Sequence, residues 1–206
     1  MVKSQRDLSR ELSKLKLFED PQFKLEQYET PPHIAADWIW EMAQRSEVAG
    51  KTILDAGCGT GILGLGLLLM GARKIYFVEK DESAMKICME NYNTLKKEYE
   101  IGEAEFILHD ISIFDEQVDV VVQNPPFGTK EVHADKVFLE VAFKSTNIIY
   151  SMHKYSTAKF VEAISKDFGF TITKTWRYDF PIKAKYEFHQ KPVKDIDVGL
   201  WRMEKI

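Results

Sequence analysis

The chain has 206 residues, of which 45% are hydrophobic and 29% are charged, and its formal net charge is −4 at pH 7. This length can bury the core of one large domain, and the ordinary composition excludes a disordered or collagen-like protein. The two cysteines are too few for a disulfide framework or a cysteine-based zinc site. The charged N-terminus is no signal peptide, and no apolar run reaches the ~18 residues of a membrane span. We therefore expect a cytoplasmic enzyme or binding module without a membrane segment or a metal.

The first fifty residues are predicted to form a helical cap. Residues 5–17 place leucines on one helical face, and a second helix follows the turn around Pro31 and Pro32. Beyond residue 50, short apolar runs alternate with helical patterns. Strands are predicted at 52–57, 74–81, 104–110, 117–124 and 147–153, and helices at 61–70, 82–98, 133–146 and 155–167.

Continuous apolar strands that alternate with helices indicate a parallel sheet covered on both faces. After Gly169 two segments alternate like half-exposed strands, which predicts an antiparallel hairpin that closes the sheet. The predicted fold class is α/β, a Rossmann-like doubly wound sheet that is mostly parallel with an antiparallel C-terminal hairpin. We expect a single domain over 1–206, with the helical cap at 1–50 and the Rossmann-like core at 51–206.

Candidate binding residues follow the ends of four predicted strands. Ligands of such sheets bind outside the carboxyl ends of the strands. The glycines after the first strand let the backbone turn tightly and approach a ligand, and the acidic residue after the second can accept hydrogen bonds from the hydroxyls of a ribose. The residues are Asp55, Gly57, Gly59 and Gly61 at the carboxyl end of the first strand and in the turn beyond it, Glu79 at the end of the second, Asp110 at the end of the third and Asn124 at the end of the fourth.

One competing interpretation is a nicotinamide dinucleotide site. Gly59, Gly61 and Gly64 satisfy the G-x-G-x-x-G pattern, and Glu79 lies near the expected acidic position. That reading does not explain Asp55, which would repel a pyrophosphate but can face a cationic group. It also leaves the loop after the fourth strand without a role.

This loop reads "NPPF" at 124–127 and follows the valine-rich strand directly. Two consecutive prolines donate no backbone hydrogen bond and hold φ near one value, so the loop is stiff and rich in acceptors. With Asp-x-Gly-x-Gly-x-Gly at 55–61, the sequence resembles the class I S-adenosylmethionine-dependent methyltransferases. The "NPPF" motif is similar to that of enzymes that methylate exocyclic or side-chain amide nitrogens.

A more specific resemblance, to a single family of methyltransferases, covers nearly the whole chain. "LEQYETPPHIAADWI" (25–39), "NPPFGTK" (124–130), "YSMHKYST" (150–157) and "YEFHQK" (186–191) resemble the methyltransferase-like protein 5 family, which makes N6-methyladenosine in small-subunit ribosomal RNA. The resemblance implies S-adenosylmethionine as the cofactor. The cofactor-binding residues that it implies are Gln27, Tyr28, Thr30, Asp55, Gly57, Gly59, Gly61, Ile62, Glu79, Lys80, Asp110, Ile111 and Asn124.

The "NPPF" loop then has a chemical role. The Asn124 side-chain oxygen and the Pro125 carbonyl can accept the two N–H groups of an adenine N6 amine. Phe127 can stack on a base flipped out of its helix, and Pro126 stiffens the loop. These four residues are the predicted catalytic group, and positioning supplies most of the expected catalysis.

Substrate and partner predictions rest on two further segments. Residues 181–194 combine lysines with aromatic side chains, as in proteins that grip a nucleic acid strand. The predicted RNA contacts are Lys130, Lys183, Lys185, His189 and Lys191. The strand at 104–110 is expected at an edge of the sheet, where a second chain could pair with it. The family resemblance implies a small zinc-binding activator protein as that partner.

Three alternatives remain open from the sequence. A protein glutamine amide presents the same two N–H donors as adenine, and so does adenine in DNA. A non-catalytic RNA-binding scaffold could also keep a cofactor fold, although intact Asp55, Glu79, Asn124 and Phe127 argue against it.

Overall fold

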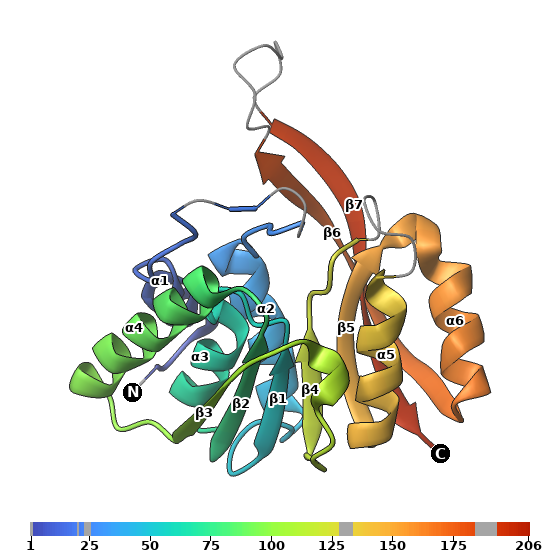
Figure 1. The fold of residues 1–206 in the computed structure, drawn as a ribbon, viewed down its shortest axis with the longest axis horizontal. Helices are drawn as coiled ribbons and strands as arrows, with labels where there is room; N and C mark the ends of the chain where they lie inside the picture. Colours follow the sequence, from blue (N-terminus) through green and yellow to red (C-terminus); the bar gives the residue numbers. More distant parts are fainter. Residues whose placement is uncertain (1, 20, 23–25, 128–133, 184–192) are drawn as a thin grey trace.

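The structure is a computed structural model that describes residues 2–19, 21–22, 26–127, 134–183 and 193–206. Its described strands form one sheet in the order β3-β2-β1-β4-β5-β7-β6 (Figure 1). The strands are β1 (Thr52–Ala56), β2 (Lys74–Glu79), β3 (Glu103–Leu108), β4 (Val120–Gln123), β5 (Ile148–Lys154), β6 (Phe170–Lys183) and β7 (Val193–Lys205).

The first five strands are parallel, and the last two reverse direction. β1 pairs in parallel with β2 and β4, β3 joins β2, and β5 joins β4. β7 is antiparallel to both β5 and β6. The predicted fold class, a mostly parallel Rossmann-like sheet with an antiparallel C-terminal hairpin, is confirmed.

Helices cover both faces of this sheet. They are α1 (Gln5–Leu12), α2 (Pro32–Gln44), α3 (Ile62–Leu69), α4 (Glu82–Glu98), α5 (Ala134–Ser145) and α6 (Ala158–Asp167), with short 3₁₀ turns η2 (Ile111–Ile113) and η3 (Tyr155–Thr157). One hydrophobic core joins α1, α2, α3 and α4 to the sheet, and a second joins α5 and α6 to its other face. The sheet is therefore doubly wound.

Local sequence accounts for the helix starts near the site. The Asp81 carboxylate caps α4 by accepting hydrogen bonds from the backbone N–H groups of Ser83 and Ala84. α2 begins at Pro32, where a proline at the first helical position loses no hydrogen bond. α1 ends at Leu12 and not at residue 17 as expected. Leu15 is still buried, because the chain beyond the helix packs on the same core.

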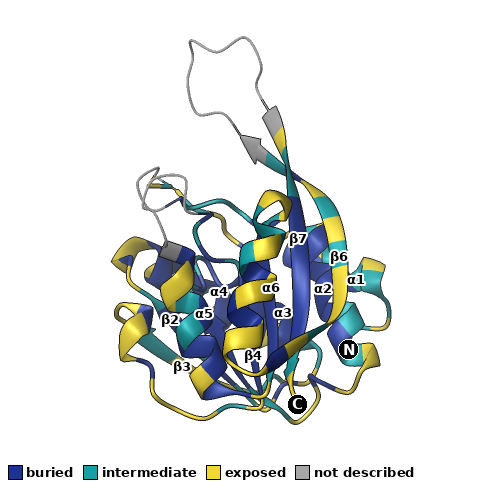
Figure 2. Cartoon of the chain, turned by 90° about the vertical axis from the view of Figure 1, so that its right-hand side faces the viewer, coloured by how far each residue is buried: buried dark blue, intermediate teal, exposed yellow. Residues whose placement is uncertain are grey.

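The prediction that both hairpin strands are half exposed is wrong for β7. Residues 198–203 are all buried, and Figure 2 shows the central part of β7 in dark blue beside the mixed colours of β6. The cause is that both faces of β7 are covered, since Val198 and Leu200 pack in one core and Trp201 and Met203 pack in the other. Only β6, at the edge of the sheet, has the exposure that the alternating pattern predicts.

Among the described residues, the structure contains no helix whose length and apolar content would let it cross a membrane. In the same residues, no three or more histidine, cysteine, aspartate or glutamate side chains gather as ligands for a metal ion.

Candidate active site

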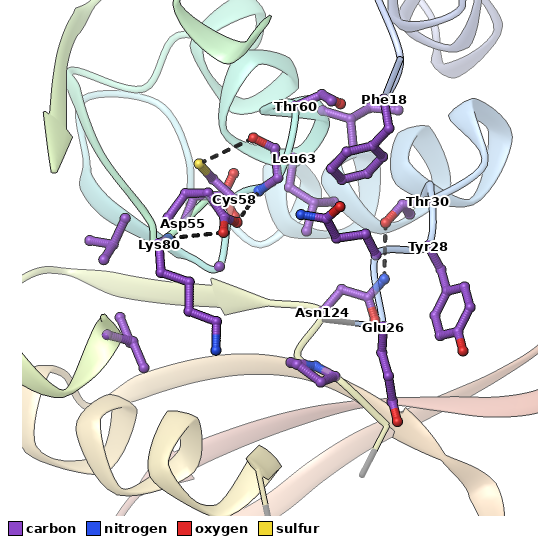
Figure 3. Close-up of a pocket in the computed structure, with 18 of the residues that line it drawn as sticks. Phe18, Glu26, Tyr28, Thr30, Asp55, Cys58, Thr60, Leu63, Lys80 and Asn124 are labelled. Carbon is purple, nitrogen blue, oxygen red and sulfur yellow. Dashed lines mark hydrogen bonds between the residues drawn. The ribbon is translucent and has the colours of Figure 1, made fainter. Parts of the chain in front are cut away.

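A pocket lies at the carboxyl ends of β1, β2 and β4 and is closed on one side by the chain before α2 (Figure 3). This is the position at which open α/β sheets bind their ligands. Most residues predicted from the sequence line it: Gln27, Tyr28, Thr30, Asp55, Gly57, Gly59, Ile62, Glu79, Lys80, Asp110, Ile111, Asn124 and Pro126. Gly61, Pro125 and Phe127 are not among the lining residues.

The glycine turn after β1 needs glycine for two reasons. Gly57 has φ 69° and Gly59 has φ 54°, a backbone region that side chains disfavour. An added Cβ at Gly57 would also lie 2.8 Å from the ring of Phe138, and one at Gly59 would lie 2.9 Å from the ring of Phe18. Two aromatic rings from distant segments therefore pack directly on this turn.

Asp55 holds the start of α3. Its side chain is 1% exposed, and it accepts a hydrogen bond of 2.8 Å from the backbone N–H of Gly64. Burial raises the pKa of Asp55 to about 7; the hydrogen bond from Gly64 opposes this, and the charge of Glu79 adds to it. A dinucleotide pyrophosphate would need such helix N-terminal donors, and here a carboxylate occupies one of them. The geometry therefore disfavours the nicotinamide interpretation.

Glu79 ties the glycine turn to the end of β2. One of its carboxylate oxygens accepts from the Gly59 N–H at 2.9 Å, and the other accepts from Lys80 N–H at 2.9 Å and Asp81 N–H at 3.0 Å. Burial raises the pKa of Glu79, while these hydrogen bonds lower it. Two carboxylate oxygens have about four acceptor positions, so Glu79 can also accept from ligand hydroxyls.

Asp110 and Ile111 form the wall after β3. The Asp110 carboxylate accepts a hydrogen bond of 3.0 Å from the backbone N–H of Ser112 and so caps the turn η2. This hydrogen bond holds the pKa of Asp110 below its ordinary value. Ile111 is buried beside it and gives the pocket an apolar surface on which a flat ring could pack.

Asn124 is the polar residue on the opposite wall. Its side-chain nitrogen donates a hydrogen bond of 3.0 Å to the Thr30 hydroxyl, drawn as a dashed line in Figure 3. Its side-chain oxygen is buried and accepts no hydrogen bond in the part of the chain that the structure describes. Because a buried acceptor without a donor costs about 1–3 kcal/mol, its position suggests a ligand donor. The structure therefore brings a free acceptor to the pocket.

Phe127 is covered in this conformation. Phe127 is 7% exposed. The ring of Tyr28 stacks on it and the ring of Phe180 packs against it in a T-shaped arrangement, each with a centroid-to-centroid distance of 6.0 Å. A base can stack on the Tyr28 side of Phe127 only after Tyr28 has moved. No local pattern predicts this cover, because Tyr28 and Phe127 are far apart in the chain.

The chain before α2 is tied across the pocket. The Gln27 side chain accepts from the Gln22 N–H at 2.7 Å and donates to the Asp81 carboxylate at 2.7 Å. Gln22 donates a further hydrogen bond of 3.0 Å to Asp81. Gln27, Tyr28 and Thr30, which the family resemblance implies as cofactor contacts, all line the pocket in this arrangement.

Several lining residues were not predicted. They are Leu17, Phe18, Glu26, Glu29, Cys58, Thr60, Leu63, Val78, His109 and Phe138. Phe18 is placed by Asn91 of α4, whose amide accepts from the Lys16 N–H at 2.8 Å and donates to the Lys16 carbonyl at 3.0 Å. No local pattern at Phe18 signals this pairing. The buried Glu26 stands directly before the predicted Gln27 and could have been suspected from that position.

The structure does not test the residues that were predicted to contact RNA. Lys130, Lys185, His189 and Lys191 lie outside the described residues, and Lys183 is described only as the backbone end of β6.

Residues 38–151 match the family model of the methyltransferase small domain. The rRNA N(6)-adenosine-methyltransferase Mettl5 of Drosophila melanogaster is 36% identical over 195 residues, which cover 91% of this chain and 90% of the fly protein. The corresponding METTL5 of Danio rerio is 33% identical and covers 90% of this chain and 91% of its own. The crystal structure of a candidate RNA methyltransferase from Pyrococcus horikoshii has a TM-score of 0.90 and 36% identity, with both chains fully covered.

Proposed function

The chain belongs to the METTL5-like family of S-adenosylmethionine-dependent methyltransferases, and on that premise we propose that it methylates N6 of an adenosine in structured RNA. Small-subunit ribosomal RNA is the expected substrate. The observation that carries the proposal is the buried side-chain oxygen of Asn124 at the wall of the pocket, which has no hydrogen-bond partner among the described residues. An exocyclic amine supplies the N–H donor that this oxygen lacks.

The residues around the glycine turn fit S-adenosylmethionine. The turn is shaped by positive φ at Gly57 and Gly59, so the backbone can approach a ligand closely. Glu79 is placed to accept from ribose hydroxyls, and Asp55 accepts from the Gly64 N–H, a donor at the start of α3 that a phosphate would otherwise use. We assign cofactor contacts to the full set named from the sequence: Gln27, Tyr28, Thr30, Asp55, Gly57, Gly59, Gly61, Ile62, Glu79, Lys80, Asp110, Ile111 and Asn124.

When bound, S-adenosylmethionine supplies an electrophilic methyl group. The protein's own task is then to orient the amine. The Thr30 hydroxyl fixes the amide plane of Asn124 by accepting from its nitrogen, which leaves the oxygen to accept one N6–H. The Pro125 carbonyl is assigned the second N6–H. Held in this way, the nitrogen lone pair would face the methyl group of a bound cofactor, whose sulfonium would become a neutral thioether as its S–C bond breaks. The methylated amine would then pass one proton to solvent, so orientation by Asn124 and Pro125 supplies most of the rate.

Phe127 is assigned the stacking of the flipped base, with Pro126 stiffening the loop. Stacking on an aromatic ring contributes about 1–3 kcal/mol for each base. Because Tyr28 stacks on Phe127, the base has to displace Tyr28 before it reaches the ring. Lys130, Lys183, Lys185, His189 and Lys191 are proposed to contact the RNA backbone.

A protein partner is proposed at β3, the edge of the sheet that lies opposite β6. β3 pairs only with β2 among the described strands, and its last residue, Leu108, is 49% exposed. Glu103, Ala104 and Phe106 place no proline or lysine on this edge. An unguarded edge strand invites pairing with another chain, and we propose a small zinc-binding activator protein there, in a heterodimer.

We also propose that residues 1–206 form one methyltransferase domain, because Leu8 and Leu12 of α1 lie in the same core as Ile53 of β1. Cytoplasmic action stays a prediction.

Transfer of a tritiated methyl group tests the proposal. The purified chain, alone and with the activator from the same source, is incubated with labelled cofactor and four substrates: ribosomal RNA, an adenine-containing DNA duplex, a release-factor protein, and RNA whose adenosines already carry N6-dimethyl groups. We expect label in the first substrate alone, recovered as N6-methyladenosine. If the label appears in the protein or the DNA instead, that molecule and not RNA is the substrate. If none of the four substrates is labelled, the result favours a non-catalytic scaffold.

A further inference from the structure

Four polar side chains form a buried row on the α5 face of the sheet, outside the pocket. Gln123 at the end of β4 and Ser151 of β5 are cross-strand neighbours, His153 follows two residues later, and Asp135 lies in the first turn of α5. Their exposed fractions are 0% for Gln123, 0% for Ser151, 1% for His153 and 9% for Asp135. None of them lines the pocket, and the proposed function gives none of them a role.

The contacts join them in one continuous chain. The Gln123 amide nitrogen donates to the Ser151 hydroxyl oxygen at 2.9 Å. That oxygen lies 2.6 Å from His153 Nε2, and His153 Nδ1 lies 3.4 Å from the Asp135 carboxylate. The row therefore runs from β4 through β5 to α5.

The direction of the donors depends on the tautomer of His153. With the ring hydrogen on Nδ1, His153 presents a donor to the Asp135 carboxylate, which is an acceptor, and Nε2 accepts from the Ser151 hydroxyl. The Ser151 oxygen in turn accepts from Gln123. The side-chain oxygen of Gln123 is buried without a partner among the described residues.

The order of serine, histidine and aspartate matches that of a hydrolase triad, yet a nucleophile must reach its substrate. Ser151 is fully buried beneath α5 and outside the pocket. The row therefore has no means to attack a ligand, and its effect must pass through the segments that it connects.

Those segments flank the "NPPF" motif. Gln123 directly precedes Asn124, and Asp135 lies in the first turn of α5, eight residues beyond Phe127. Buried polar groups are costly to desolvate, and a fully connected row also specifies one arrangement of the elements that carry it. Apolar side chains at these four positions could fill the same space, but they would not specify one orientation of β4, β5 and α5 relative to one another.

We infer that Gln123, Ser151, His153 and Asp135 are positioning residues that hold the two ends of the Asn124-containing segment at a fixed separation, so that the Asn124 oxygen keeps its place at the pocket wall. The inference rests on the proposed function for its kinetic consequence only. Displacement of a reacting group by about 1 Å can lower a rate by about 10²-fold, so a partial loss of position should be measurable.

The test compares Ser151→Ala with Ser165→Ala. Ser165 is equally buried, and its hydroxyl donates to the Val161 carbonyl in α6, away from the row. We expect Ser151→Ala to lower kcat for RNA methylation about tenfold, with the Kd for S-adenosylmethionine unchanged within about twofold. Ser165→Ala should change neither. Asp135→Asn keeps an acceptor oxygen for His153 and should retain more activity than Asp135→Ala.

Hydrogen–deuterium exchange supplies a readout that needs no substrate. Exchange at the amides of Gln123, Asn124 and Phe127 should rise in Ser151→Ala and not in Ser165→Ala, while exchange over 55–61 stays constant. If wild-type protein methylates no RNA but exchange changes in this way, the proposed function fails and the positioning role stands. Unchanged exchange, or equal kcat losses in the two serine variants, would overturn the inference.

Discussion

The two walls of the pocket are built in different ways. On the cofactor wall, the carboxylates of Asp55 and Glu79 accept hydrogen bonds from backbone N–H groups of the glycine turn and of α3, and the wall is complete without a ligand. On the substrate wall, Asn124 keeps an unpaired oxygen and Phe127 is covered by Tyr28. One wall is preformed, whereas the other reaches its final contacts only when a substrate arrives.

This difference has a physical origin. A small cofactor with fixed chemistry can be matched by backbone geometry, which glycine and buried carboxylates hold rigidly. A base that must leave an RNA helix arrives with its own unstacking cost, so a covered ring and an unpaired acceptor can select for the correct donor. Five substitutions, at Asp55 and Glu79 on the cofactor wall and at Asn124, Tyr28 and Phe127 on the substrate wall, test this difference.

The largest effect is expected in the pH dependence of stability at the cofactor wall. Folded Asp55 keeps its proton up to a pKa of about 7, whereas an unfolded aspartate loses its proton near 3.8. Between these values the folded state binds more protons, so the contribution of Asp55 to the free energy of unfolding falls as pH rises from about 4 to 7. The loss approaches about 4 kcal/mol. Asp55→Asn keeps an acceptor for Gly64 and does not titrate.

Urea unfolding of both proteins at several pH values between 4.5 and 7.5 measures this contribution. The stability of Asp55→Asn relative to wild type should increase with pH across that window. Parallel pH profiles for the two proteins would mean that Asp55 is ionised in the folded state throughout.

The next effect concerns Asn124 on the substrate wall. Asn124→Ala removes the unpaired oxygen and its hydrogen bond to Thr30. We expect kcat to fall on the order of 10² or more, as at other sites that lose a preorganised polar group, with the Kd for S-adenosylmethionine nearly unchanged. Single-turnover methylation and calorimetry give the two values. Turnover at the wild-type rate would contradict the mechanism.

A substitution at Glu79 should weaken cofactor binding and leave kcat unchanged, the opposite of the result expected for Asn124→Ala. In wild type the two Glu79 oxygens together accept from the backbone N–H groups of Gly59, Lys80 and Asp81. Glu79→Gln replaces one of these oxygens with an amide NH₂ group, which is a donor and so faces a backbone N–H that has lost its acceptor. We expect about tenfold weaker cofactor binding, in line with the loss of a hydrogen bond to a charged group, and an unchanged kcat at saturating cofactor. A fall in kcat at saturation would show that the two walls are coupled.

The smallest effect is expected at Tyr28. Because Tyr28 is also assigned a cofactor contact, Tyr28→Ala is measured at saturating cofactor; if Tyr28 otherwise only covers Phe127, the KM for RNA should stay within about threefold of wild type. Since stacking contributes about 1–3 kcal/mol, a rise of tenfold or more would make Tyr28 the ring on which the base stacks. Phe127→Leu, which removes the ring beneath it, is the matched comparison.

The preformed wall was also the part that sequence could predict. Asp55, the glycines and Glu79 lie at strand ends, and strand ends follow from local apolar runs, so their meeting is a consequence of a parallel sheet. Asn124 was found in the same way. The hydrogen bond that leaves its oxygen unpaired was not, because it depends on the rotamer of Thr30 in another segment.

What the sequence missed depends on contacts between distant segments. Phe18 and Phe138 reach the glycine turn from opposite halves of the chain, and each looks like an ordinary core residue in its own segment. The row from Gln123 to Asp135 is divided among three elements, so no spacing reveals it. β7 was misread because alternation is a property of one strand, whereas burial depends on the helices and strands that cover the two faces of the sheet at that strand.

The place of β7 also sets an order for folding during synthesis. β6 is translated before β7, but β7 is the strand that joins it to β5. Until residues 193–205 have left the ribosome, β6 therefore has no sheet partner, and the edge of β5 beside it is open. Parallel strands from β1 to β5 can assemble first, as the nascent chain emerges, while the final hairpin must close afterwards in a single step. A pause in translation before residue 193 would hold two unpaired strand edges within one molecule, which is the state most exposed to aggregation and to chaperones.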